Sequence, residues 1–255
     1  MQHDIEFTRT TPFANKAPEA PTAHVDKVSG LNAIFKTAGA RSVLKASLDN
    51  ADLGRVALVS SFGADSVVLL HMASIIDKSL PVIFIDTEML FHETLIYQAQ
   101  LTIDLGLWNV RIIRPDEHET NARDPKGDLY QSSTHACCSL RKTRPLNRAL
   151  EGFGGWISGR KRFQSGTRAQ LDYFEAEETG RIKVNPLAHW SLKDIKAYMD
   201  VNDLPRHPLI SKGYPSIGCA PCTSKVAEGD DPRSGRWSGS AKTECGIHLS
   251  VGAAK

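Results

Sequence analysis

The sequence has little that would tie it to a membrane, an export route or a nucleic acid. Its 255 residues contain no apolar run long enough to span a bilayer. Residues 1–7 lack the basic and apolar regions of a secretory signal. The formal net charge of +2 gives no excess of basic residues for a nucleic-acid partner. We therefore expect a cytoplasmic protein without a membrane or nucleic-acid partner.

Cysteine is also scarce, with five in the chain. In a reducing compartment, cysteines serve more often as ligands or redox groups than as structural disulfides. Because five is odd, any pairing or quartet leaves one thiol over. The length and the 41% hydrophobic content still allow one sizeable α/β core.

The pattern along the chain predicts three regions. Proline among small and polar residues predicts a poorly ordered tail over residues 1–25, and an α/β domain is expected over residues 26–215. Residues 216–255 are expected to form a cysteine loop that binds a metal group and a mobile, reactive C-terminal tail, since glycines stand at 229, 235, 239 and 246. Short apolar runs alternate with helical spacing, which predicts a doubly wound, mostly parallel sheet of about five strands flanked by helices. The expected strands are residues 56–60, 81–85, 110–113, 155–158 and 182–186, and residues 114–134 are expected to form a loop or short turns.

A strand, a loop of small residues and a helix follow one another at residues 56–75. The unpaired N–H groups and dipole of such a helix start favour an anion. The loop, residues 60–66, matches neither common phosphate-binding motif, so alone it reads as an ordinary turn.

Four cysteines form two pairs, Cys137 with Cys138 and Cys219 with Cys222. Four thiolates suit zinc or an iron–sulfur cluster. Adjacent cysteines are awkward for one tetrahedral ion but can bind different irons of a cluster, so we favour a 4Fe–4S cluster. The alternatives are buried thiols for the first pair and a redox dithiol for the second.

Cys245 is the remaining thiol. His248 and the upstream arginines Arg233 and Arg236 could stabilise its thiolate, which would make it a nucleophile. The alternative is an inert thiol in a terminal segment.

Four separated motifs together resemble the assimilatory adenylyl-sulfate reductase branch of the sulfonucleotide reductases, within the PP-loop superfamily. They are residues 60–63, residues 86–91, the two cysteine pairs, and Glu244-Cys-Gly-Ile-His248. The resemblance runs from about residue 30 to the C-terminus. Phe62 stands where the ATP-cleaving members have a glycine, which fits a site that holds a nucleotide without cleaving ATP.

The resemblance implies a reaction. Cys245 would attack the terminal sulfur of adenosine 5′-phosphosulfate, releasing AMP, and reduced thioredoxin or a similar dithiol would then release sulfite. The cluster would act electrostatically and structurally, without net redox change. Cations must offset the charge of the substrate.

The resemblance also assigns the binding residues. Lys142, Arg168, Arg233, Arg236 and His248 would contact the substrate, and the main chain around Ser60, Ser61, Phe62, Gly63, Ile85 and Thr87 would hold adenosine and ribose. Arg141, Arg144, Arg148, Arg160, Lys161 and Arg162 are expected to be solvated surface charges.

Three other functions remain open from the sequence. The first is a reductase for the 3′-phosphorylated nucleotide, with the same fold and nucleophile. The second is a PP-loop tRNA thiolase, which would require a broader basic surface. The third is a non-catalytic zinc module. A homo-oligomer is compatible with the sequence.

Overall fold

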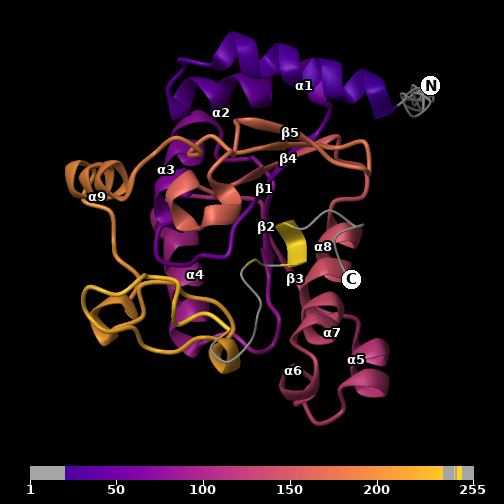
Figure 1. Cartoon of the computed structure of the whole chain (residues 1–255), viewed down its shortest axis with the longest axis vertical. Helices are drawn as coiled ribbons and strands as arrows, with labels where there is room; N and C mark the ends of the chain where they lie inside the picture. The colour runs from indigo at the N-terminus through magenta and orange to yellow at the C-terminus, as the bar shows by residue number, and fades with distance from the viewer. Residues whose placement is uncertain (1–20, 238–243, 245, 249–255) are drawn as a thin grey trace, which may run out of the picture.

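The structure, a computed structural model, describes residues 21–237, 244 and 246–248. Its described part contains one sheet with the strand order β3-β2-β1-β4-β6-β5 (Figure 1). The strands are β1 (Val56–Val59), β2 (Val82–Ile85), β3 (Val110–Ile113), β4 (Gly155–Ser158), β5 (Phe174–Ala176) and β6 (Ile182–Val184). All neighbours pair in parallel except β5 and β6. The predicted doubly wound, mostly parallel sheet is confirmed.

The central strands are short and apolar because both faces of the sheet are covered. All four residues of β2 and of β4 are buried, as expected for parallel strands between two layers of helices. Gly154 makes the start of β4 possible, since a Cβ there would lie 2.3 Å from the carbonyl oxygen of Leu53. The sixth strand, β5, was not predicted because three residues, Phe-Glu-Ala, carry too little pattern.

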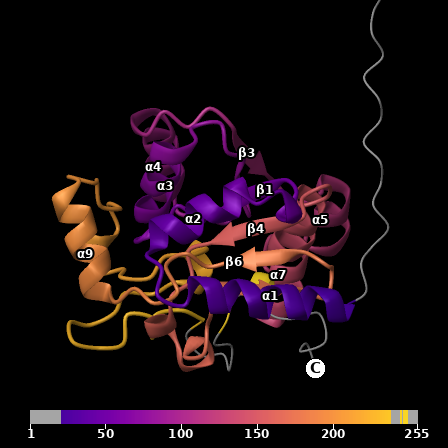
Figure 2. The same cartoon turned by 90° about the horizontal axis from the view of Figure 1, so that it is seen from above.

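Helices cover both faces of the sheet, and α1 lies at its edge (Figures 1 and 2). They are α1 (Pro21–Phe35), α2 (Ala40–Asp49), α3 (Ser66–Ile76), α4 (His92–Asp104), α5 (Glu117–Arg123), α6 (Leu129–Ser132), α7 (Thr134–Cys138), α8 (Arg144–Ala149) and α9 (Leu192–Val201). Helices α3 and α4 lie on one face of the sheet, and α8 packs on β2 and β3 from the other. Helix α1 runs beside β5 at the edge of the molecule. No helix in the described part of the chain is both long and apolar enough to cross a bilayer.

Two helix starts differ from the sequence expectation, and a third agrees with it. Helix α1 begins at Pro21, inside the segment expected to be a tail, while residues 1–20 lie outside the described part. Helix α5 lies in the segment expected to be a loop, where the Asp116 side chain accepts a hydrogen bond from the Glu119 N–H. The residues Ser191-Leu-Lys-Asp194 fit an N-cap followed by an acidic N3 residue, and Ser191 and Asp194 form that capping box at the start of α9.

The core lies on both faces of the sheet. On one face, Leu58 and Phe84 pack with residues of α2, α3 and α4. On the other, Ala57, Ile83 and Trp156 pack with residues of α8. The alternation of side chains along each strand separates the two clusters, and the loops at the strand ends are left to form a site.

Candidate active site

The loop after β1 is closed by its own hydroxyl groups. The Phe62 N–H donates to Ser60 Oγ at 3.1 Å, and the Gly63 N–H donates to Ser66 Oγ at 3.0 Å. These amides are therefore used within the loop, unlike those of loops that wrap a nucleotide phosphate. Phe62 has a φ of 47°, in the left-handed region that glycine favours, which explains why related loops place glycine there.

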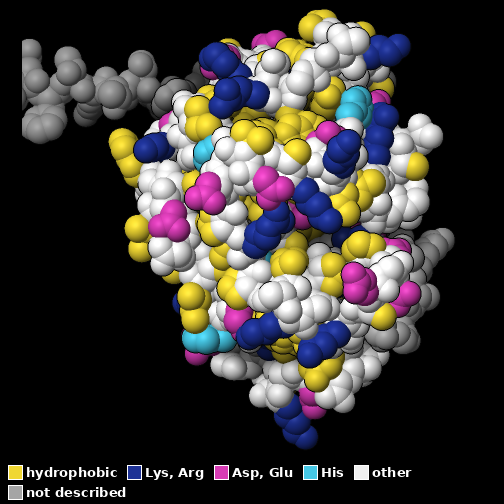
Figure 3. All heavy atoms as spheres, turned by 90° about the vertical axis from the view of Figure 1, so that its left-hand side faces the viewer, with side chains coloured by type: hydrophobic (Ala, Val, Ile, Leu, Met, Phe, Trp, Pro, Cys, Tyr) yellow, Lys and Arg dark blue, Asp and Glu magenta, His cyan; other side chains and the backbone are white. Residues whose placement is uncertain are grey.

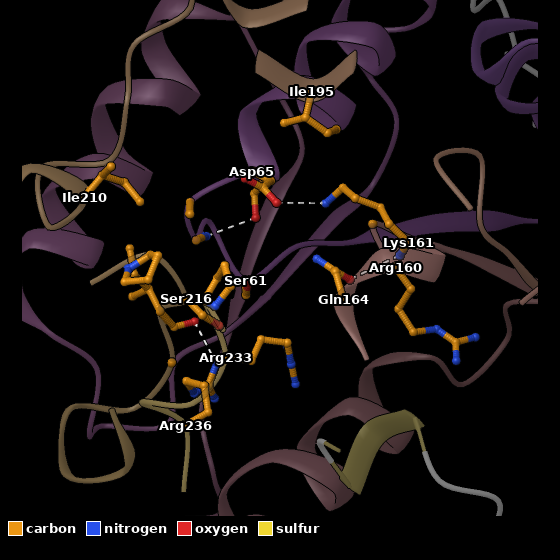
Figure 4. A pocket seen from close by; sticks show the side chains of 18 of the residues that line it. Ser61, Asp65, Arg160, Lys161, Gln164, Ile195, Ile210, Ser216, Arg233 and Arg236 are labelled. Atoms are coloured by element: carbon orange, nitrogen blue, oxygen red, sulfur yellow. Dashed lines mark hydrogen bonds and ion pairs between the residues drawn. The ribbon is translucent and has the colours of Figure 1, made fainter. Parts of the chain in front are cut away.

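The loops at the carboxyl ends of β1, β2 and β4 surround a cavity of about 690 Å³ (Figure 4). This edge is where open α/β sheets bind ligands. Leu69, Ile195 and Met199 line the cavity with apolar side chains. Figure 4 shows Arg233 and Arg236 at the end away from Ile195. Of the predicted residues, the cavity is lined by Ser60, Ser61, Gly63, Ile85, Lys142, Arg168, Arg233, Arg236 and His248. A volume of this size suits a nucleotide.

Two predicted nucleotide contacts lie elsewhere. The Phe62 side chain is fully buried in the core and meets the Phe84 ring edge-on at 5.3 Å. Only its main chain remains for a ligand. Thr87 is buried beside the cysteines, with Oγ1 3.2 Å from Cys219 Sγ. Their roles in holding adenosine and ribose stay predictions.

The segment after β4 contributes two buried cations that the sequence reading took for surface charges. Lys161 is 2% exposed, and its Nζ lies 3.2 Å from Asp65 (Figure 4). Burial lowers the pKa of Lys161, and the pairing with Asp65 opposes that shift. Arg160 is 7% exposed and pairs with Glu175; burial lowers its pKa to about 10. Their position directly after a buried strand, at the ligand-binding edge, was the signal that could have identified them.

The loop over residues 230–237 brings Arg233 and Arg236 to the cavity from the opposite side (Figure 4). The Arg236 guanidinium lies 4.6 Å from the Trp237 ring centroid and donates to the carbonyl oxygen of Ile217 at 3.1 Å. Gly218 is needed for this placement, because a Cβ there would lie 2.1 Å from Arg236 Nη2. The sequence motif identified the arginines but not the glycine on which one of them packs.

The C-terminal motif reaches the same cavity. Glu244 accepts two hydrogen bonds of 2.6 Å from Arg168, and the His248 ring stacks on Trp156 with centroids 6.0 Å apart. Burial, followed by the nearby Lys183, lowers the pKa of His248, so its imidazole is neutral near pH 7. Cys245 lies outside the described residues.

The four paired cysteines converge, as the sequence reading expected. Cys137, Cys138, Cys219 and Cys222 line one small cavity together with Lys142. The first pair ends α7 and continues into a π-helical turn, Ser139–Thr143, a rare geometry that often marks functional sites. Ala220, within the second pair, donates its N–H to the carbonyl oxygen of Met89 at 2.8 Å.

Arg141 ties the two halves of this cysteine cavity together. It was expected at the surface, yet it is 5% exposed and contacts Asp124 at 2.9 Å, Glu88 at 3.2 Å and the carbonyl oxygen of Thr87 at 3.2 Å. It thereby joins the π-helical turn to the end of β2. No local sequence signal separates this arginine from its exposed neighbour Arg144, which is 45% exposed.

The electrostatics of the cysteine cavity are uneven. Burial raises the pKa of Cys137 to about 12 and also raises that of Cys222. Burial acts the same way on Cys219, but Lys142, Thr87 and Arg236 outweigh it and hold the pKa of Cys219 below its ordinary value. Lys142 lines both this cavity and the larger one, so it is the group they share.

The fit of the cysteine cavity to a metal group rests on its donors. Four thiols and no competing carboxylate line it, which is the donor set of an iron–sulfur cluster or a structural zinc ion. The void is about 10 Å³, so the side chains would have to turn outward around a cluster. Within the described residues, no group of three or more His, Cys, Asp or Glu side chains is arranged around a single-ion site.

The family model for the phosphoadenosine phosphosulfate reductase domain matches residues 55–225. The chain belongs to this family. A curated relative from Mesorhizobium japonicum, named adenosine 5′-phosphosulfate reductase, is 50% identical over 224 residues, which cover 88% of each chain. A relative of the same name from Mycobacterium tuberculosis is 43% identical and covers 76% of each chain.

A crystal structure of the family supports the fold. The phosphoadenylyl-sulfate reductase from Candida auris, solved as a phosphate complex, superposes with a TM-score of 0.67 at 27% identity. The match covers 79% of this chain and 97% of that one. The region that the family model matches contains the strands beside the larger cavity and all four paired cysteines. The C-terminal motif lies beyond this region.

Proposed function

We propose that this protein reduces adenosine 5′-phosphosulfate to sulfite and AMP. The observation that carries the proposal is that the cationic cavity and the four-thiol cavity meet at Lys142. Family membership and relatives named for this reaction, at 43–54% identity, support it. The substrate carries adenosine at one end and two anionic groups at the other, which matches a cavity with apolar and cationic sides.

In the proposed reaction, the thiolate of Cys245 attacks the sulfur of the sulfo group. The bond between that sulfur and the bridging phosphate oxygen breaks, AMP leaves with the electron pair, and an S-sulfocysteine remains. A thiolate of a thioredoxin-type dithiol then attacks Cys245 Sγ, and sulfite leaves with the S–S electron pair. The second thiol of the donor resolves the mixed disulfide, so the dithiol supplies both electrons.

The cations have defined tasks in this scheme. Arg233 and Arg236 would hold the phosphate, and Lys142 would face the sulfo group from the cysteine side. An anionic nucleophile approaching an anionic group is repelled, and fixed cations offset this repulsion most strongly in a site that excludes water. The neutral His248 would be able to donate one hydrogen bond without adding charge. Arg168 donates to Glu244 and Gln164, and its task is considered below.

Cys137, Cys138, Cys219 and Cys222 would hold a 4Fe–4S cluster. When bound, it would supply a fixed electrostatic field beside Lys142 and join the π-helical turn to the loop of Cys219. The adjacent cysteines favour a cluster over one zinc ion, because neighbouring side chains point apart. Anaerobic purification with an iron count and a visible spectrum tests this assignment, and zinc without iron would contradict it.

A thiolase acting on tRNA is disfavoured by two observations. The amides of the loop after β1 bond to Ser60 and Ser66, not outward toward a nucleotide phosphate. On the face in Figure 3, the described Lys and Arg side chains are interspersed with Asp and Glu, without a continuous basic band. An RNA-binding surface would show such a band.

The decisive experiment compares two substrates. Steady-state sulfite release is measured with adenosine 5′-phosphosulfate and with its 3′-phosphorylated counterpart, using reduced thioredoxin and the anaerobically purified protein. We expect a kcat/KM at least about 100-fold higher for the first nucleotide. The second one carries an additional 3′-phosphate, and burying it without a partner in the site would reduce kcat/KM by about this factor. Mass spectrometry of the enzyme mixed with nucleotide but no thiol should find one sulfo adduct on Cys245. A preference for the 3′-phosphorylated nucleotide, or an adduct on Cys219, would contradict the proposal.

A further inference from the structure

A buried ion pair joins Arg168 to Glu244 of the C-terminal motif. Arg168 Nε and Nη2 each lie 2.6 Å from one carboxylate oxygen of Glu244. The two side chains are 6% and 7% exposed. This is the bidentate geometry in which a guanidinium binds a carboxylate most strongly.

A third donor of Arg168 is also directed to the protein. Arg168 Nη1 donates to Gln164 Oε1. The edge formed by Nε and Nη2 is the one a substrate anion would use, and here a carboxylate of the same chain holds it. A substrate anion and Glu244 cannot occupy that edge together.

We propose that Glu244 is a positioning residue: it anchors the C-terminal motif, which carries the proposed nucleophile Cys245, on Arg168. This inference rests on the proposed function. The motif is held at two residues, one before Cys245 in the sequence and one after it. Glu244 pairs with Arg168, and the His248 ring stacks on Trp156. Two anchors four residues apart leave the peptide between them few conformations, which reduces the entropy lost on reaching the attacking geometry.

The opposite reading is that Glu244 mimics the substrate, and that the nucleotide displaces it. Displacement would take the bidentate guanidinium contact from a buried carboxylate, and losing one member of a buried ion pair is strongly unfavourable. The cavity also holds donors that need no such exchange. Arg160 Nε and Arg236 Nε are buried and have no hydrogen-bond partner among the described residues. The geometry therefore favours a retained pair.

Kinetics of Glu244→Gln separate the two readings. The amide keeps the size of the carboxylate but removes its charge and places an NH₂ group against a cation. We expect kcat to fall about 10- to 100-fold with KM changed less than about 2-fold, the signature of a lost transition-state arrangement. Glu178→Gln is the matched control, because it removes the same charge from an exposed position. A lower KM with unchanged kcat would overturn the proposal in favour of substrate mimicry.

A second readout does not depend on the reaction. The alkylation rate of Cys245 by iodoacetamide, measured by peptide mass spectrometry without nucleotide, should rise at least about tenfold in Glu244→Gln, because breaking a buried pair depopulates the anchored state. Arg168→Lys, which keeps the charge but loses the fork, should behave alike. Equal alkylation rates in the wild type and Glu244→Gln would overturn the proposal. If the wild type reduced neither nucleotide, the proposed function would be refuted. The alkylation rates of Cys245 in the wild type and Glu244→Gln could still be compared.

Discussion

The two cavities that share Lys142 are organised differently. In the larger one, ion pairs fix the cations in the absence of a ligand, as Asp65 does for Lys161 and Glu244 for Arg168. In the smaller one, burial keeps the thiols of Cys137 and Cys222 neutral. Neutral thiols are weak hydrogen-bonding groups, and the proposed metal group would displace their protons. Ion pairs of the protein itself hold the first region, and the second is the one that the proposed metal group would complete.

This difference separates two capacities of the protein. Nucleotide binding should depend on the larger cavity alone, and turnover should depend on both. Lys142 is the exception because it lines both cavities. Substitutions in each cavity, and of Lys142 itself, test whether nucleotide binding and turnover separate in this way.

The largest effect is expected from removing a thiol of the smaller cavity. Cys137→Ser should reduce sulfite formation at least about 100-fold and abolish visible absorption, because it would remove a ligand of the proposed cluster and with it the cluster's field at Lys142. Nucleotide affinity, measured by equilibrium binding, should change less than about threefold if the larger cavity is preorganised. Full turnover by a variant that lacks iron would break the comparison.

The shared lysine should give the next largest effect. Lys142→Met keeps the length of the side chain and removes the ammonium, so kcat/KM should fall about 100-fold, the typical loss for one group that stabilises transition-state charge. Lys126→Met, at an exposed position, is the control. Iron content must be measured in parallel. If activity fell only in proportion to the iron content, Lys142 would act by supporting the smaller cavity and not by stabilising the substrate.

The sequence predicts the parts of this site that depend on local pattern. The strands are recognisable because β1, β2 and β4 are continuous apolar runs, and the carboxyl ends of parallel strands meet at one edge. Cysteine spacing predicted the convergence of Cys137 and Cys222, which line one cavity. Each strand and each cysteine pair is recognisable from residues that are close together in the chain, whereas the meeting of the two pairs was expected from the number of thiols that a metal group needs.

The buried cations were not predictable because their partners are distant in sequence. Lys161 pairs with Asp65, 96 residues away, and Arg141 pairs with Asp124 across a loop. A basic residue is usually exposed, and only tertiary structure shows which ones find a buried carboxylate. Phe62 illustrates the same limit within a residue, since the motif identified its position but not that its side chain points into the core.

Phe62 stands between Ser61 and Gly63, which line the larger cavity, while its own ring lies in the core, so its removal should affect stability first. A left-handed φ costs a non-glycine residue about 1–2 kcal/mol. Burying the ring against Phe84 contributes about 2–3 kcal/mol from area and about 1 kcal/mol from the edge-on contact. Alanine bears the same left-handed cost, so Phe62→Ala loses the burial and ring-contact terms, about 3–4 kcal/mol, and the cavity left behind adds to this loss. The free energy of unfolding should fall by about 3–5 kcal/mol. Denaturant unfolding measures it, with the 74%-exposed Ile34→Ala as control. A loss below about 1 kcal/mol would mean that the ring is not packed as described.

The smallest effect concerns Lys183, a buried cation behind the larger cavity. Its Nζ lies 4.5 Å from the centroid of the Trp156 ring. Burial lowers its pKa to about 7; Arg160 and Arg168 also lower it, and Glu177 and Glu244 oppose the shift. In the unfolded chain the pKa returns to about 10.4.

The sign of the pH dependence follows from these two values. Below about pH 7 both states hold the proton, so folding bears the full cost of burying the ammonium; between about pH 7 and about pH 10 the folded state releases the proton first, and stability rises. Lys183→Met removes this cost and should raise the free energy of unfolding by about 1 kcal/mol at about pH 6.5, with a smaller gain at about pH 9. Urea unfolding of both proteins at the two pH values measures the difference. An equal gain at both pH values would show that Lys183 does not titrate between them.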